Sequence, residues 1–278
     1  MRRTACLIAL AFLAASTLRA QAPQPGGAVG NSLPAAVEFQ SECTGFIANP
    51  DIRRELFVAG GADDDFHTVV RQFVQGDSIF ISRHNSGDIA VGAEYRVVRP
   101  ANDLFRTMHY QGERGMIRSV GKPYEDVARV QVTHLDPEGA VAKVLLSCGP
   151  IMPGDTLVPF ESRLVPQYTV TKPLDPFAPL NLNNARGRIT ASENNYGYVG
   201  GEMVVYIDLG DGGVIRTGDR FRIYKRLPPH STGFMKSQRL PPETVGEAVV
   251  LSVQRKSCVA IVVSSSREIS TGDYVELE

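Results

Sequence analysis

The chain has 278 residues, of which 43% are hydrophobic and 21% charged, with 29 basic residues against 30 acidic ones. A chain of this length can bury the cores of more than one small domain. Its slightly negative net charge excludes the strongly cationic surface on which nucleic-acid-binding proteins depend, so we expect no nucleic acid partner.

The first residues have the pattern of a secretory signal peptide. Two arginines follow the initial methionine, an apolar stretch runs from Ala5 to Ala15, and small residues follow at Ala20 and Ala22. The apolar stretch is well short of the roughly 20 residues that span a bilayer. We therefore predict a signal peptide over residues 1–22, with cleavage after Ala22 or, alternatively, after Ala20. The mature chain would have no transmembrane segment and would be periplasmic or secreted.

Two proline-containing segments divide the rest of the chain. Residues 23–38 combine Pro, Gly and Ala without apolar periodicity, which predicts a flexible linker. Residues 163–190 hold four prolines among asparagines, and proline at that density disfavours both helix and interior strand. We therefore expect two folded units, over residues 39–162 and 191–278, joined by a Pro-rich linker.

The two units repeat each other. Asp77–Arg99 matches Met203–Lys225 at an offset of 126 residues, and Val127–Asp155 matches Val245–Asp273 at an offset of 118. The positions that agree are apolar residues and glycines, which indicates a duplicated supersecondary unit. The difference of eight residues lies between the two halves of the first unit, within 103–119, where the pattern allows at most one short helix.

Apolar and polar residues alternate within the units, as Phe221, Ile223 and their neighbours do in Arg220–Lys225. Such alternation is typical of a half-buried strand. Glycine supplies the positive φ that tight hairpins require, so Gly-Asp pairs predict turns between the strands. The predicted turn residues are Gly92, Gly154, Asp155, Gly213, Gly218, Asp219, Gly272 and Asp273. Together these signals predict an all-β chain of two small antiparallel β-barrels related by internal duplication, whose closure leaves no exposed sheet edge.

Three cysteines follow the predicted signal peptide. Cys43 and Cys148 flank the first unit, and export to an oxidising compartment makes a disulfide between them the expected state. Such a bridge would tie an N-terminal strand, Glu42–Ile47, to the last hairpin of the unit. Cys258 lies in an alternating, strand-like stretch and is interpreted as a buried small apolar residue rather than a reactive thiol. Cysteine and histidine do not occur at zinc-ligand spacing, so we predict no metal site.

The sequence contains no nucleophile elbow, phosphate-binding loop, zinc-protease motif or dinucleotide-binding turn. We therefore expect neither an enzyme nor a cofactor. The function that remains is that of a structural or protein-binding module of the cell envelope, whose partner is another envelope protein. The alternative is a peptidoglycan- or polysaccharide-binding protein, which would use exposed aromatic residues. The candidates are Tyr110, Tyr196, Tyr198 and Phe234.

The second unit resembles the C-terminal domain of flagellar assembly protein T. The likeness is carried by Val204–Gly210, Gly213–Phe221, Val245–Val250 and Glu268–Val275. The first unit matches more loosely, since Ala93 stands where the second unit has Asp219 and Ala128 stands where it has Gly246. The resemblance implies an envelope-associated β-barrel module whose relatives include part of a periplasmic ring around a motor. The N-terminal and middle domains of that flagellar protein have no counterpart in this chain.

Overall fold

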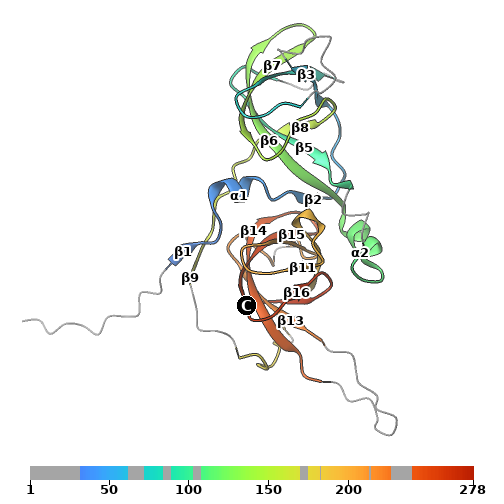
Figure 1. Cartoon of the computed structure of the whole chain (residues 1–278), viewed down its shortest axis with the longest axis vertical. Coiled ribbons are helices and arrows are strands. Elements are labelled where there is room, and N and C mark those ends of the chain that lie inside the picture. Colours follow the sequence, from blue (N-terminus) through green and yellow to red (C-terminus); the bar gives the residue numbers. More distant parts are fainter. Residues whose placement is uncertain are drawn as a thin grey trace, which may run out of the picture.

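The computed structural model describes residues 32–61, 72–83, 89–102, 108–169, 175–181, 183–212, 214–226 and 240–278. In these ranges the chain forms two β-barrels that follow one another along the long axis of the molecule (Figure 1). The predicted signal peptide, residues 1–22, lies outside them. None of the helices in these ranges is long and apolar enough to cross a membrane.

The first barrel closes through six antiparallel strands. These are β3 (Leu56–Gly61), β4 (Ser78–Arg83), β5 (Glu94–Pro100), β6 (Lys122–Leu135), β7 (Gly139–Ser147) and β8 (Thr156–Pro159). Around the barrel they follow the order β3, β4, β7, β6, β5 and β8, and β8 pairs with β3 to close it. A further strand, β2 (Phe46–Ala48), pairs with the start of β6 outside the barrel.

The second barrel also has six antiparallel strands. These are β10 (Arg186–Ser192), β12 (Val204–Ile207), β13 (Arg220–Lys225), β14 (Glu243–Val253), β15 (Cys258–Ser265) and β17 (Tyr274–Leu277). Their order around the barrel is β10, β12, β15, β14, β13 and β17. Two short strands, β11 (Tyr198–Val199) and β16 (Ile269–Ser270), pair with each other beside it.

Both barrels place their strands in the same Greek-key order, namely first, second, fifth, fourth, third and sixth. The registers also agree. Ile79 lies opposite Ala142 in the first barrel, and Val205 lies opposite Ala260 in the second, which are the same positions at the two predicted offsets. The structure thus confirms the all-β fold class and the duplication of the barrel.

A second apolar layer covers part of the outside of the second barrel. The outward side chains of β12, β14 and β15 are buried against two parts of the first unit. One is the N-terminal segment that contains helix α1 (Glu38–Glu42) and strand β2, and the other is helix α2 (Glu113–Val120). The buried members of this junction cluster are Ala35, Ala36, Ile47, Ala101, Ile117, Val120, Ala191, Val204, Tyr206, Val249, Leu251, Val259 and Ile261. Because both faces of these strands are buried, their sequences are continuously apolar rather than alternating.

The longer loop of the first unit forms this contact. Helix α2 lies between β5 and β6, where the first unit has its eight additional residues, and it packs beside the second barrel (Figure 1). Its Ile117 and Val120 belong to the junction cluster. The single short helix that the sequence allows in this loop is therefore one of the elements that join the two units.

The predicted turn glycines adopt the left-handed backbone wherever the structure describes them. Gly92, Gly154, Gly218 and Gly272 have φ values from 84° to 97°. In the turns that end at Asp155, Asp219 and Asp273, the carboxylate accepts the backbone N–H of the residue three positions earlier, at 2.7 to 2.8 Å. This hydrogen bond is the reason for aspartate after the glycine. Gly213 lies outside the described residues.

The N-terminal linker is more ordered than expected. Its last residues form strand β1 (Ser32–Pro34), which pairs with β9 (Gln167–Thr169). Glu42, expected to open a strand, instead ends helix α1, and the strand that follows is β2. The sequence interpretation missed both features because β1 and α1 are held by tertiary contacts and carry no periodicity of their own.

The Pro-rich linker is fastened to the second barrel. The carbonyl oxygens of Pro176 and Ala185 accept backbone N–H groups of Thr244 and Leu277, at 2.7 and 2.9 Å. Proline lacks a backbone N–H but keeps its carbonyl group. A proline-containing segment can therefore lie along a barrel and accept hydrogen bonds from the backbone N–H groups of its strands. The first strand of this barrel, β10, begins at Arg186, earlier than the expected start of the unit at residue 191.

Strand β13 differs from its expected half-buried state. Its outward residues Arg222 and Tyr224 are 6% and 1% exposed. Arg222 is ion-paired with Glu276, and its guanidinium also donates to the carbonyl oxygens of Ala178 and Pro179. The linker thus covers Arg222, whose polar side chain indicated solvent exposure but donates to the carbonyls of the covering segment.

Candidate functional site

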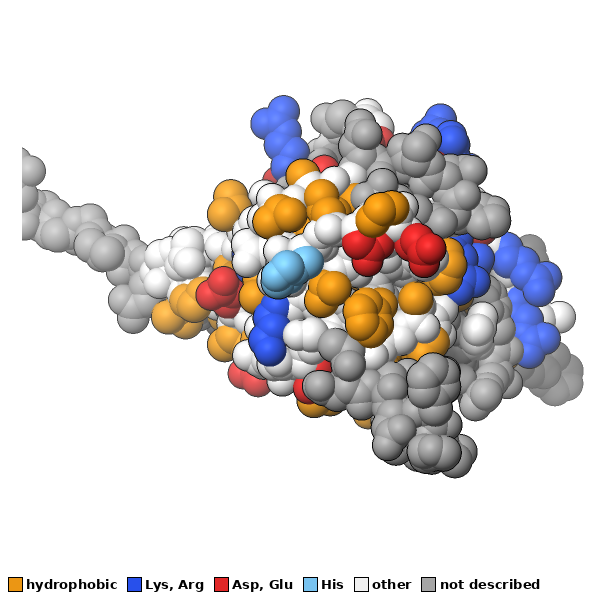
Figure 2. Space-filling model, turned by 90° about the horizontal axis from the view of Figure 1, so that it is seen from above, with side chains coloured by type: hydrophobic (Ala, Val, Ile, Leu, Met, Phe, Trp, Pro, Cys, Tyr) orange, Lys and Arg blue, Asp and Glu red, His pale blue; other side chains and the backbone are white. Residues whose placement is uncertain are grey.

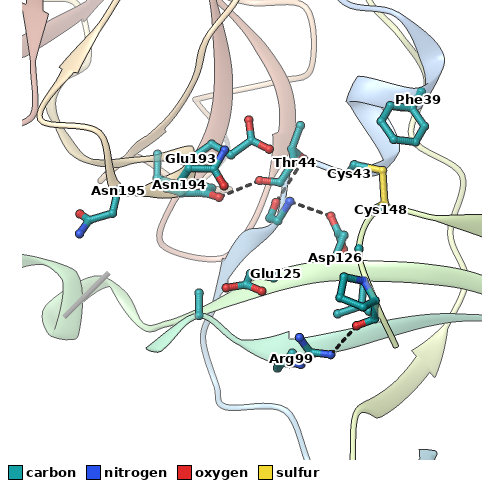
Figure 3. Close-up of a pocket in the computed structure, with 16 residues that line it drawn as sticks. Phe39, Cys43, Thr44, Arg99, Glu125, Asp126, Cys148, Glu193, Asn194 and Asn195 are labelled. Carbon is teal, nitrogen blue, oxygen red and sulfur yellow. Dashed lines mark hydrogen bonds between the residues drawn. A yellow bond between two sulfur atoms is a disulfide. The ribbon is translucent and has the colours of Figure 1, made fainter. Parts of the chain in front are cut away.

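A cavity of about 400 Å³ lies between the two units, next to the disulfide. Cavities of this size, particularly between domains, are the usual location of ligand sites. The first unit contributes residues of α1, β5 and β6, and the second contributes the 3₁₀ turn Glu193–Asn195 and Tyr206 of β12 (Figure 3). We call this space the junction cavity.

One wall of the junction cavity is the disulfide between Cys43 and Cys148. The two Cα atoms lie 5.5 Å apart, within the usual range for a bridge. Cys43 directly follows α1, so the bridge holds this helix to the end of the first barrel. Phe39 of the same helix lines the cavity and is 52% exposed.

A buried ion network supports the same wall. Arg96 on β5 contacts Glu42 at 2.8 Å and Oδ1 of Asp126 at 3.3 Å, and Arg163, beyond β8, contacts Oδ2 of Asp126 at 2.5 Å. Asp126 also accepts the backbone N–H of Gly45 at 2.8 Å. Removing one member would leave a buried charge without its partner, which is strongly destabilising. The network therefore fixes where the α1 segment crosses the first barrel.

The opposite wall contains the carboxyl group of Glu193. Burial, together with the negative charge of Asp126, raises the pKa of Glu193 to about 7. The two residues after it, Asn194 and Asn195, have φ values of 57° and 56°. Asparagine tolerates this left-handed conformation better than most residues. The imidazole Nε2 of His109, from the first unit, lies 3.0 Å from the carbonyl oxygen of Asn195.

Tyr206 links the cavity to the junction cluster. Its hydroxyl group donates to the carbonyl oxygen of Thr44 at 2.7 Å, and burial raises its pKa. On the floor, Arg99 donates to both carboxylate oxygens of Asp155, at 2.7 and 2.6 Å. The cavity thus combines carboxyl and amide groups with an aromatic ring at its rim, an arrangement that can bind a polar ligand through hydrogen bonds.

The predicted site residues do not all meet at this cavity. Cys43 and Cys148 line it, and Asp155 reaches it through Arg99. The other predicted turn residues are distributed over the two barrels and act in the fold. Cys258 is fully buried in the second barrel, and burial raises the pKa of its thiol.

The aromatic candidates occupy different environments. Tyr196 and Tyr198 are exposed, at 52% and 67%, and directly follow the turn that lines the cavity. Tyr110 packs against Gly272 of the second barrel. Phe234 lies outside the described residues.

The sequence interpretation missed Glu193, Asn194 and Asn195. The two adjacent asparagines, followed by Tyr196 and Gly197, are a turn signal that could have been noticed. The sequence gives no sign of the raised pKa of Glu193, because the shift arises only when the first unit covers this turn.

No protein-family model matches the sequence. No curated protein matches it either.

Proposed function

We propose that this protein is an exported, non-catalytic module of the cell envelope that binds another envelope protein. The observation that carries the proposal is the junction cluster, which joins two copies of one barrel through a shared buried core. Two barrels held by a shared core present their surfaces at a fixed separation. This suits a protein that positions a binding partner better than one that only links two parts flexibly. The disulfide and the expected signal peptide support export, and the resemblance to the C-terminal domain of flagellar assembly protein T supports an envelope location.

Affinity purification from an envelope extract tests this function. The mature chain should retain a defined protein partner after washing, whereas Ile117→Asp, which opens the junction cluster, should weaken retention. Glu38→Gln, at an exposed position of α1, is the matched control and should retain the partner like the parent. Failure to retain any protein would contradict the proposal.

A second candidate function is binding of peptidoglycan or another polysaccharide. It is favoured by the exposed Tyr196 and Tyr198, which lie next to the polar junction cavity. A tyrosine ring offers an apolar face and a polar hydroxyl group, which suits contact with a sugar that is partly apolar and partly polar. Co-sedimentation with purified sacculi that is lost in the Tyr196→Ala, Tyr198→Ala double variant would support it, and the absence of co-sedimentation would exclude it.

A further inference from the structure

We propose that the outer face of β4, β7 and β6 in the first barrel is the docking surface for the partner, and that the partner binds there through a short amphipathic segment with aliphatic side chains and a carboxylate. This inference rests on the proposed function, because it assigns the place and the chemistry of the protein contact.

The docking face consists of two cross-strand rows. Strand register places Phe80, Val141 and His134 side by side in one row, and Ser78, Lys143 and Gln131 in the next. Phe80 is 42% exposed, although it lies in the middle of a strand. Seen from above, the free end of the first barrel shows hydrophobic side chains gathered around a histidine (Figure 2).

The duplication shows what such a face binds. At the two offsets of the repeat, Phe80 corresponds to Tyr206 and Val141 to Val259. In the second barrel these residues are 6% and 0% exposed, because segments of the first unit cover them. One face of one fold is therefore covered in the second copy and open in the first.

The covering segments define the chemistry of the contact. They are a short helix, which contributes Ile117 and Val120, and a short strand, which contributes Ile47. Thr44, two residues before this strand, accepts a hydrogen bond from the hydroxyl group of Tyr206 through its carbonyl oxygen. The surface of the second barrel thus binds aliphatic side chains from short segments that cross its strands.

The differences between the two faces indicate how the partner differs from these segments. Lys143 is exposed and occupies the position of buried Ile261, so an occupant needs a carboxylate where the junction cluster supplies aliphatic groups. Ser78 and Gln131 replace Val204 and Val249, which gives the face a polar rim around Phe80. An aromatic anchor with a polar rim is the composition of an interface that also exists free in water.

Site-specific photo-crosslinking in the intact envelope tests the proposal. A benzoylphenylalanine at position 80 should give one discrete protein adduct, and the crosslinked peptide should be amphipathic and contain an acidic residue. The same probe at position 164, where Leu164 is 80% exposed outside this face, is the matched control and should not give the adduct. Lys143→Glu should lower the yield at position 80 by about tenfold, since it places like charges together.

The outcomes separate the two proposals. If the partner is retained on affinity purification but position 80 gives no adduct, or gives one with a lipid, a glycan or a second copy of this chain, the docking face is wrong and the proposed function stands. If no protein is retained at all, the proposed function fails. Phe80→Ser should abolish retention while leaving the melting temperature within a few degrees of the parent, because the side chain points away from the core.

Discussion

The backbone of Gly218 has a φ of 91°, in the left-handed region that residues with a Cβ avoid. A Cβ here would lie 3.6 Å from the Cβ of Pro166, an ordinary contact, so the cost of a substitution comes from the backbone. We expect Gly218→Val to lower the free energy of unfolding by more than roughly 1 kcal/mol, measured by denaturant melts. Gly201→Val, at a glycine without positive φ and with open space around it, should cost less. A Gly218→Val variant as stable as the parent would contradict the assignment.

Glu202 occupies the position that Gly76 has in the first unit, and both have positive φ, at 65° and 95°. The left-handed conformation costs a residue with a Cβ roughly 1–2 kcal/mol. Replacing Glu202 with glycine removes this cost, but glycine loses more backbone entropy on folding, which offsets part of the stability gained. We expect Glu202→Gly to raise the free energy of unfolding by roughly 0.5–1 kcal/mol. Thermal melts should show no such gain for Glu202→Ala, which keeps the strain. An equal gain in both variants would assign the effect to the side chain.

Glu193 makes the junction sensitive to pH. Its pKa is about 7 in the folded protein against 4.5 in a solvated carboxyl group, so folding favours the protonated form. The contribution of this group to stability is fully present below about pH 4.5 and is lost as the pH rises towards 7. Denaturant melts across this range should show the decline, and Glu193→Gln should reduce it. An unchanged pH profile in Glu193→Gln would rule out this origin.

The disulfide between Cys43 and Cys148 stabilises the attachment of helix α1 to the first barrel. Cys43 and Cys148 are 105 residues apart, and in the entropic model closing a loop of that length raises the free energy of the unfolded chain by about 4.7 kcal/mol. We expect the Cys43→Ser, Cys148→Ser double variant to lose stability of that order in thermal melts. Intact-mass measurements before and after reduction should differ by two hydrogens for the parent. Two free thiols in the untreated protein would contradict the bridge.

Helix α2 marks the limit of what the sequence could predict about the elements. The difference between the two offsets located its loop, and the glycines predicted the turns between the strands, but the order of the strands around each barrel was not predicted. The surface that Ile117 covers could not be predicted, because an eight-residue helix does not identify its neighbour. A signal existed in Val204–Ile207, where residues of both faces are apolar, but without the fold this run is equally compatible with a strand buried inside one barrel.

At the scale of the whole molecule, the junction cluster decides how the chain responds to cleavage. Mild proteolysis should cut first between the barrels, within residues 166–184, which end before β10 begins at Arg186. The two fragments should then remain together in size-exclusion chromatography, because buried apolar surface holds them. Ile117→Asp should let them separate, whereas Gly201→Val should not. Fragments of the parent that separate immediately after cleavage would show that the cluster does not hold the barrels together.

The covered face of the second barrel also restricts which part of the gene can encode a stable protein by itself. Because Val204, Val249 and Ile261 are apolar, a gene fragment encoding only the second barrel would produce a chain with an exposed apolar sheet surface, prone to aggregate. The first barrel has Ser78, Lys143 and Gln131 at the corresponding positions of its sheet, and the apolar residues that it would expose alone, such as Ile47 and Ile117, lie on segments outside the barrel. The two copies are therefore unequal: the sheet face of the second barrel needs a cover, whereas that of the first is compatible with water.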